Sequence, residues 1–127
     1  MEFEENKSIY LQIAELLCEQ ILAGKCPQQE KIPSVREMGM MVQVNPNTVL
    51  RTYDLLQQKG IIFNKRGIGY FVENNAIEKI LEYKRDDFYE NTLPRFFKSM
   101  VLLRISPEDI QKRYQKYILS DSELNKK

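Results

Sequence analysis

The chain has 127 residues, of which 43% are hydrophobic and 29% charged, a composition typical of one globular domain with an appendage. It contains no histidine, which removes the commonest general base and metal ligand, and its net charge of +1 does not by itself indicate a nucleic-acid partner. No apolar run approaches the roughly 20 residues of a membrane-spanning helix, and the acidic residues 1–5 do not resemble a signal peptide. We therefore expect a cytoplasmic protein without a membrane partner.

The residues that usually carry catalysis are missing or badly placed. The sequence shows no glycine-rich phosphate loop and no pair of carboxylates in an apolar setting. Cys18 and Cys26 match neither a CxxC motif nor a disulfide framework, so we interpret them as reduced thiols that fill space, with a redox sensor as the alternative. The sequence thus predicts no catalytic residue, no metal, no cofactor and no enzyme.

The first predicted helix spans residues 8–23, because its apolar residues recur with a period of 3.6. Ser8 is placed to cap its start, and Gly24 lies where a left-handed C-cap belongs. Residues 25–33, which end on a proline, are predicted to form a loop.

Two further helix starts follow closely. Ser34 and Glu37 fit a capping box, and Asn45 followed by a proline starts a third helix over residues 46–59, before Gly60. Only residues 43–45 separate the two helices, which predicts a helix-turn-helix. The expected core-facing residues are Val35, Met38, Met41 and Val42 in the second helix, and Val49, Tyr53 and Leu56 in the third.

A β-hairpin is predicted directly after the third helix. Two apolar runs, residues 61–63 and 70–72, flank a basic tip that contains two glycines. A helix-turn-helix followed by a basic hairpin is a winged helix, in which the hairpin is the wing. Residues 31–70 carry six cations and two acids, a local excess of +4 in a nearly neutral chain.

The last third of the sequence is predicted to be helical. Residues 76–103 read as one long helix that Pro94 should kink or split, and Ser106 with the following proline starts a last helix. We expect the polar tail from Ser120 to fray. The predicted fold class is therefore mostly α with a small β-hairpin: a winged helix-turn-helix domain over residues 1–75 and a C-terminal two-helix dimerisation arm over residues 76–127.

Polar and basic residues gather where a winged helix meets DNA. A recognition helix enters the major groove with its N-terminus first, so its first residues must be small and able to form hydrogen bonds. Each of these residues alone has a plain reading as a helix cap or a solvated side chain, and only their conjunction in one fold favours DNA. The predicted DNA-binding residues are Ser34, Arg36, Asn45, Asn47, Thr48, Arg51, Lys65, Arg66, Gly67 and Gly69.

Four segments in order resemble the DNA-binding domain of GntR-type bacterial transcription regulators: residues 32–38, 44–53, 56–62 and 66–72. The string of residues 44–49 and the short C-terminal extension most resemble the YtrA-type subfamily. This resemblance implies a homodimeric repressor on a palindromic operator of its own operon, with DNA contacts at residues given above.

Three positions depart from the family pattern. Gln29 stands where glycine is common, Gly39 where alanine is usual and Tyr70 where threonine is frequent. We expect the change at Gln29 to have little consequence, and Gly39 to loosen the second helix by roughly 1 kcal/mol relative to alanine.

The arm is predicted to pair with a second copy. About 50 residues in two helices are too few to bury both of their apolar faces, and a symmetry mate would cover them. We expect no small-molecule effector, because little chain remains to enclose a pocket, although a ligand between two arms, lined by the tyrosines of the last helix, stays open. The predicted dimer interface consists of Phe88, Phe96, Phe97, Met100, Leu103, Ile110 and Tyr114.

The hypothesis from sequence is a homodimeric winged-helix regulator, most simply a repressor, that binds double-stranded operator DNA. The alternative is a winged helix that contacts an acidic protein surface and does not bind DNA sequence-specifically. Salt-dependent binding to duplex DNA separates the two.

Overall fold

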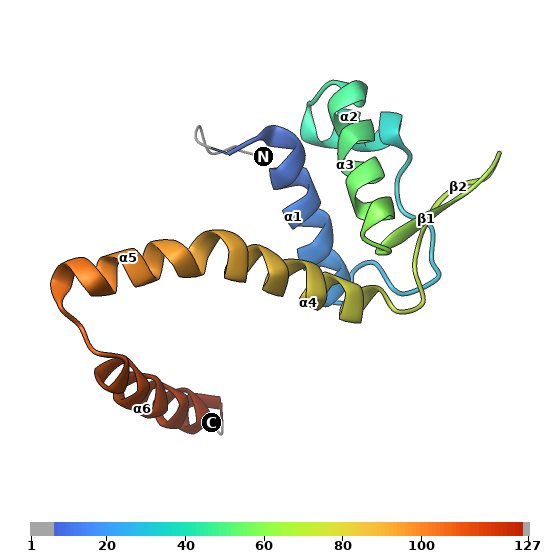
Figure 1. Ribbon diagram of the computed structural model, residues 1–127. Coiled ribbons are helices and arrows are strands. Elements are labelled where there is room, and N and C mark those ends of the chain that lie inside the picture. The colour runs from blue at the N-terminus through green and yellow to red at the C-terminus, as the bar shows by residue number, and fades with distance from the viewer. Residues whose placement is uncertain (1–6, 126–127) are drawn as a thin grey trace. The chain divides into compact units, whose positions relative to one another are not determined.

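The computed structural model describes residues 7–125, and the side chains of residues 7–122 (Figure 1). It is mostly helical, with one two-stranded antiparallel hairpin, as the sequence predicts. The elements in order are α1 (Ile9–Leu22), α2 (Val35–Val42), α3 (Pro46–Gln58), β1 (Ile62–Lys65), β2 (Gly69–Val72), α4 (Ala76–Asp87), the π-helical turn η1 (Phe88–Thr92), α5 (Leu93–Leu103) and α6 (Pro107–Asn125).

The chain forms two compact units, the first ending at Arg85 and the second beginning at Asp86. We expected the division ten residues earlier, after residue 75. The start of α4 belongs to the first unit, because Ala76 and Ile80 are fully buried in that unit's core. The assignment of the two parts to DNA binding and dimerisation stays a prediction.

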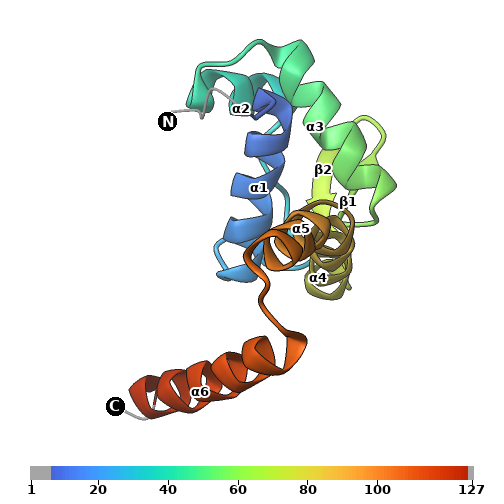
Figure 2. The ribbon, with the colours of Figure 1, turned by 60° about the vertical axis from the view of Figure 1, so that its left-hand side comes forward.

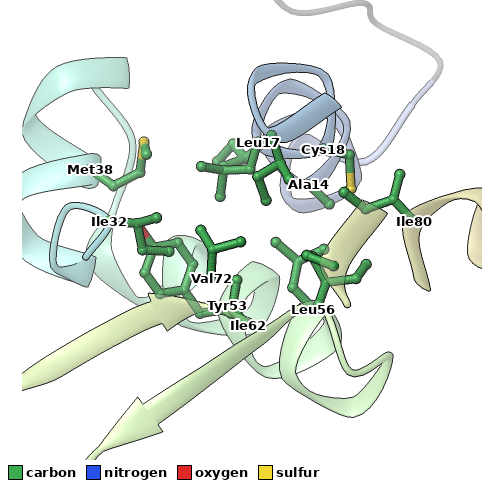
Figure 3. Packing of buried hydrophobic residues seen from close by; sticks show 14 of the residues in the cluster. Ala14, Leu17, Cys18, Ile32, Met38, Tyr53, Leu56, Ile62, Val72 and Ile80 are labelled. Carbon is green, nitrogen blue, oxygen red and sulfur yellow. The ribbon is translucent and has the colours of Figure 1, made fainter. Parts of the chain in front are cut away.

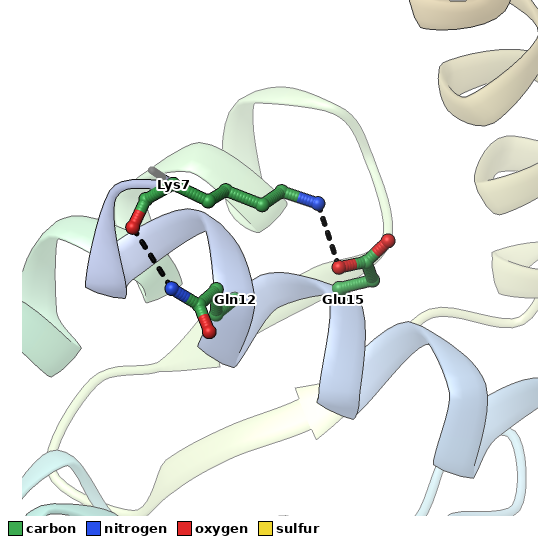
Figure 4. A network of polar contacts seen from close by, with 3 residues as sticks. All are labelled: Lys7, Gln12 and Glu15. Atoms are coloured by element: carbon green, nitrogen blue, oxygen red, sulfur yellow. Dashed lines mark hydrogen bonds and ion pairs between the residues drawn. The ribbon is translucent and has the colours of Figure 1, made fainter. Parts of the chain in front are cut away.

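The start of α1 differs from the expectation in one respect. Ser8 is the N-cap residue, but its hydroxyl makes no capping hydrogen bond. The first turn is closed by the Ser8 carbonyl, which accepts from the amides of Leu11 and Gln12. Figure 4 shows the Gln12 side chain turned back to donate to the Lys7 carbonyl (2.8 Å) and the Lys7 ammonium paired with Glu15 (2.7 Å). The predicted left-handed glycine at the other end, Gly24, is confirmed by its φ of +79°.

The helix-turn-helix forms as predicted. The Ser34 hydroxyl accepts from the Glu37 amide (3.0 Å) and the Glu37 carboxylate accepts from the Ser34 amide (3.1 Å), which completes the capping box of α2. α3 begins at the expected Asn45 cap, and Gln43 turns the chain between the two helices with φ +58°. Figures 1 and 2 show α3 beside α1, and α3 also packs against α2 and β1.

The core of the first unit gathers apolar side chains from α1, α2, α3, α4 and the hairpin (Figure 3). Val49, Tyr53 and Leu56 are fully buried, as the helical period predicts. The prediction for Met41 is wrong, because its side chain is 66% exposed while Met38 is buried. Because α2 has only about two turns and packs against α3 along one edge, only a narrow stripe of its residues is buried.

The hairpin pairs Ile62 with Val72 and Lys65 with Gly69, so residues 66–68 form its tip. The segment before α2 was expected to be a loop, but it adds an isolated bridge between Lys31 and Phe71. The amide of Gln29 donates to the Val72 carbonyl (2.8 Å) with φ +68°. The expectation that glutamine has little consequence there stays a prediction, although this left-handed backbone favours glycine over a residue that has a Cβ.

In the second unit, the helix changes from α-helical to π-helical geometry just before Pro94. The Leu93 amide donates to the Phe88 carbonyl, five residues back, so one π-helical turn directly precedes the proline. A proline lacks an N–H and crowds the carbonyl four residues before it, and the wider turn accommodates both defects. The predicted helix over residues 76–103 is therefore divided into α4 and α5 without an intervening loop.

The last helix starts as predicted and ends later than predicted. The Ser106 hydroxyl accepts from the Asp109 amide (3.1 Å), which confirms the cap. The expectation of a frayed tail from Ser120 is wrong up to Asn125, where α6 ends, since the polar residues there continue the helix. Residues 126–127, the rest of that tail, lie outside the described residues.

Candidate nucleic-acid interface

The first turn of α3 presents polar groups to solvent. The Asn45 side-chain oxygen accepts from the Asn47 amide (2.8 Å), and the Asn45 carbonyl accepts from the Thr48 amide (2.9 Å). Asn45 thus uses its oxygens to start the helix, and its side-chain NH2 group is left for other partners. Asn47 is exposed and Thr48 is half-buried. This end of α3 also carries the positive end of the helix dipole, which favours phosphate oxygens.

Arg51 lies one turn further along α3 and is also exposed. Its guanidinium carbon lies 3.8 Å from the centroid of the Tyr10 ring, which comes from α1. The structure brings Asn47, Thr48 and Arg51 together around one hollow of about 320 Å³, whose other lining residues are Ser8, Ile9 and Tyr10. Sequence reasoning missed the contribution of α1, because no periodicity or spacing shows which residue of one helix meets another helix.

The start of α2 carries two more of the predicted residues. Ser34 is half-buried and its hydroxyl oxygen is engaged by the Glu37 amide, whereas Arg36 is exposed. The hydrogen bond from the Ser34 backbone, and after it the one from the Ser34 side chain, lowers the pKa of Glu37. Ser34 therefore serves the local fold with both its amide and its hydroxyl group.

The predicted wing residues form a second group at the tip of the hairpin. Lys65, Arg66 and Gly67 are exposed, and Gly67 has φ +81°. The Lys65 ammonium lies 4.8 Å from the centroid of the Phe71 ring, so its stem runs along the hairpin.

Gly69, at the base of the wing, has φ +141°, a backbone conformation that favours glycine. A Cβ atom there would lie 2.8 Å from Cε of Lys31. Lys31 is a further exposed cation beside the wing, which the sequence analysis counted in the local excess of charge but not among the DNA-binding residues.

The predicted cations carry uncompensated charge. Among the side chains of residues 7–122 the ion pairs are Lys7–Glu15, Lys79–Glu82 and Arg113–Asp109, and they leave out Arg36, Arg51, Lys65 and Arg66. Exposed cations without carboxylate partners attract phosphate groups. The same described residues contain no group of three potential metal ligands. No helix among them combines the length and apolarity that crossing a bilayer requires.

The second unit exposes a large apolar surface. Of the predicted interface residues, Phe88, Phe96, Phe97, Leu103 and Tyr114 are between 42% and 65% exposed. Met100 is 9% exposed and Ile110 is half-buried, so both already pack inside the unit. An apolar hollow of about 390 Å³ lies between α5 and α6, lined by Phe96, Phe97, Met100, Val101, Ile105, Pro107 and Ile110. Exposed aromatic and aliphatic groups at this density mark an interaction surface.

Comparison with known proteins identifies the family of this architecture. The model of bacterial regulatory proteins of the gntR family matches residues 9–72. The chain is 35% identical to the HTH-type transcriptional regulator YhcF of Bacillus subtilis over 86% of this chain and 88% of YhcF. It is 40% identical to the HTH-type transcriptional repressor YtrA of the same organism over 60% of this chain and 58% of YtrA.

Solved structures agree with these sequence matches. A GntR-family regulator from Bacteroides thetaiotaomicron superposes with a TM-score of 0.77 at 39% identity, covering 90% of this chain and 99% of that chain. The DNA-binding domain of AraR, solved in complex with an operator, superposes with a TM-score of 0.51 at 28% identity, covering 57% of this chain and 84% of that chain. The predicted winged-helix fold is thereby confirmed.

Proposed function

The chain belongs to the GntR family of bacterial regulatory proteins, and on that premise we propose that it is a cytoplasmic homodimeric repressor that binds a palindromic operator. Members of this family are transcription regulators that bind DNA, not enzymes. Bound at its operator, the dimer would exclude RNA polymerase by occupying the promoter. The name of the relative YtrA, a repressor, supports this direction of control.

One observation carries the DNA-binding proposal. Asn47, Thr48 and Arg51 line one exposed hollow at the N-terminal end of α3, the second helix of the helix-turn-helix. The turn of α3 that enters a major groove first thus offers amide, hydroxyl and guanidinium groups, which read base edges. The DNA-binding domain of AraR, whose fold is similar, was solved in complex with an operator, which supports this proposal.

The wing and the start of α2 supply the remaining contacts in this proposal. Lys65 and Arg66 would reach phosphates or the minor groove from the hairpin tip, where Gly67 and Gly69 let the backbone approach closely. Arg36 would meet the backbone or an adjacent base from α2, with Ser34 and Asn45 holding the two helix starts. These contacts position the protein, whereas the α3 residues specify the sequence.

The exposed apolar surface of the second unit supports the proposed dimer. Its exposed aromatic residues would leave a large apolar patch in water if the chain stayed alone. A second copy covers a self-complementary patch on both subunits at once and places two recognition helices about 34 Å apart, one helical turn of DNA. A small-molecule effector is not part of this proposal.

Selection of bound duplexes from a random pool with the purified protein tests the function. We expect a symmetric consensus of two half-sites, and Arg51→Ala should weaken binding by roughly 1–3 kcal/mol and relax one base position per half-site. Enrichment of no duplex at any salt concentration would contradict the proposal and leave the protein-contact alternative. A consensus without symmetry would contradict the dimer alone.

A further inference from the structure

We propose that Tyr10 is a positioning residue for Arg51: its ring holds the guanidinium in the plane and place from which Arg51 reads a base. The inference rests on the proposed DNA-binding function and deepens it. It assigns to α1, outside the helix-turn-helix itself, a part in sequence discrimination.

The contact between the two side chains is close and leaves the useful edge of the guanidinium free. The Arg51 Cζ atom lies 3.8 Å from the Tyr10 ring centroid, within the range of a cation–π interaction. A guanidinium is planar, and its N–H donors point outward in its own plane. Stacking on a ring therefore uses the face of the group and spares the fork of donors that pairs with O6 and N7 of guanine.

The backbone of Tyr10 is held against the recognition helix. The hydroxyl of Thr52, the residue after Arg51, donates to the Tyr10 carbonyl (2.7 Å) and more weakly to the Thr48 carbonyl (3.4 Å), and Thr52 is fully buried. The shorter of these bonds connects the backbone of α1 at Tyr10 to α3 beside Arg51. A buried hydrogen bond between the two helices therefore fixes the point from which the Tyr10 side chain reaches Arg51.

Nothing else in the described part of the chain competes for Arg51. The ion pairs among residues 7–122 do not include it, so its charge stays available to DNA. An arginine side chain free in water samples many rotamers and loses them when it docks on a base. The stacked arrangement restricts those rotamers before DNA arrives, in a hollow that Asn47 and Thr48 also line.

The expected consequence is a loss of discrimination rather than of general DNA affinity. An Arg51 side chain released from the ring still finds phosphate oxygens, which carry no sequence information. Binding to unrelated duplexes should therefore stay unchanged, while the preference at the base pair that Arg51 reads should fall. Arg51→Ala identifies that base pair as the position at which its consensus relaxes.

The test compares Tyr10→Leu with Tyr10→Phe in the full-length protein, on the selected duplex and on a duplex changed at the Arg51 base pair. Tyr10→Leu should weaken binding to the selected duplex by about 2- to 5-fold, the effect of losing a cation–π contact at an exposed site, and leave the changed duplex unaffected. Tyr10→Phe keeps the ring and should bind both duplexes like the wild type. Thermal unfolding of each variant checks that the fold is intact.

A double-mutant cycle separates positioning from a direct or purely structural role. In the Arg51→Ala background, Tyr10→Leu should change neither affinity nor preference, because there is no guanidinium to hold. An equal loss in both backgrounds, or no loss in the wild-type background, would overturn the inference. If the wild type itself selects no duplex, the proposed function fails instead, so the two failures are distinguishable.

Discussion

Gly39 lies at a close contact between α2 and the turn that follows it. A glycine inside a helix is expected to weaken it, and alanine is the usual residue of the family at this position. In the structure, a Cβ atom at Gly39 would lie 2.8 Å from the Val44 carbonyl oxygen, and the Gly39 carbonyl accepts from the Val44 amide (2.8 Å). This contact favours glycine over alanine, contrary to the expectation from helix propensity, because the turn folds back onto α2 at that point.

Gly39→Ala should therefore lower stability. The strain of pushing a methyl group against backbone, roughly 1–3 kcal/mol, exceeds the helix-propensity gain of roughly 1 kcal/mol. Urea unfolding monitored by circular dichroism measures the difference. Met41→Ala, at a position of the same helix that is 66% exposed, is the control and should change little. A more stable Gly39→Ala protein would show that the turn can move without cost.

Two buried acids make the fold sensitive to alkali. Burial raises the pKa of the Cys18 thiol from 9.0 to about 11, and burial also raises the pKa of the Tyr53 hydroxyl, which donates to the Pro33 carbonyl at 2.6 Å. Both groups are protonated in the folded state at pH values where the unfolded chain begins to lose the protons. Their contribution to stability is complete below pH 9 and is lost as the pH rises towards the folded-state pKa.

The free energy of unfolding should be level between about pH 7 and 8.5 and fall by about 1 kcal/mol by pH 10. Denaturant unfolding at a series of pH values measures it. In Cys18→Ala the loss of stability by pH 10 should be smaller, because only Tyr53 and the half-buried Cys26 thiol, whose pKa burial also raises, remain. An unchanged stability up to pH 10 in the wild type would contradict the assignment.

At the scale of elements, the wing combines a rigid body with a charged tip. Phe63 and Phe71 stack across the hairpin at 5.7 Å, and Tyr70 packs edge-on against Tyr53 at 4.8 Å. These aromatic contacts fix two short strands that would be marginal alone. Tyr70, at the family's threonine position, is thus turned to the core.

Lys65→Ala tests the wing. If the ammonium contacts a phosphate, its loss should weaken binding to all duplexes alike and reduce the slope of log affinity against log salt by about 1. Ile68→Ala, at the same exposed tip without a charge, serves as the control and should leave the slope unchanged. Titrations at several salt concentrations measure both variants. An identical slope in Lys65→Ala and the wild type would remove Lys65 from the interface.

At the scale of the whole molecule, the two units differ in how they are stabilised. The first buries a complete apolar core, whereas the second has one buried apolar side chain among its described residues, Met100. Packing of exposed aromatic residues against another molecule would supply the missing burial. The proposed pairing would thus supply the burial that the second unit lacks and would also allow two half-sites to be read.

Phe97→Glu should prevent that pairing. Phe97 is 52% exposed and lines the apolar hollow of the second unit, and a buried carboxylate without a partner is strongly unfavourable. Sedimentation equilibrium should give about twice the chain mass of 15.1 kDa for the wild type and the single-chain mass for the variant. Lys98→Glu, at the adjacent exposed residue, should remain dimeric. A monomeric wild type would refute the dimer outright.

Local features of this protein could be read from its sequence because they depend on residues a few positions apart. Neighbouring residues determine the capping box of Ser34 and Glu37, the Asn45 cap, the buried stripe of α3 and the hairpin. The sequence pattern therefore predicts all four. The sequence also predicts the helix defect at Pro94, whereas its form, a π-helical turn, follows from the geometry of the folded backbone.

What only the tertiary structure decided is where segments far apart in the chain meet. The Tyr10 ring on Arg51 and the Thr52 hydroxyl on the Tyr10 carbonyl arise where α1 packs against α3. Such contacts depend on the rotation and distance of packed elements, and periodicity places a residue on a face without naming its partner. The residue types of the proposed DNA-binding surface can therefore be read from the sequence, whereas their arrangement around the N-terminal end of α3 results from the packing of α1 against α3.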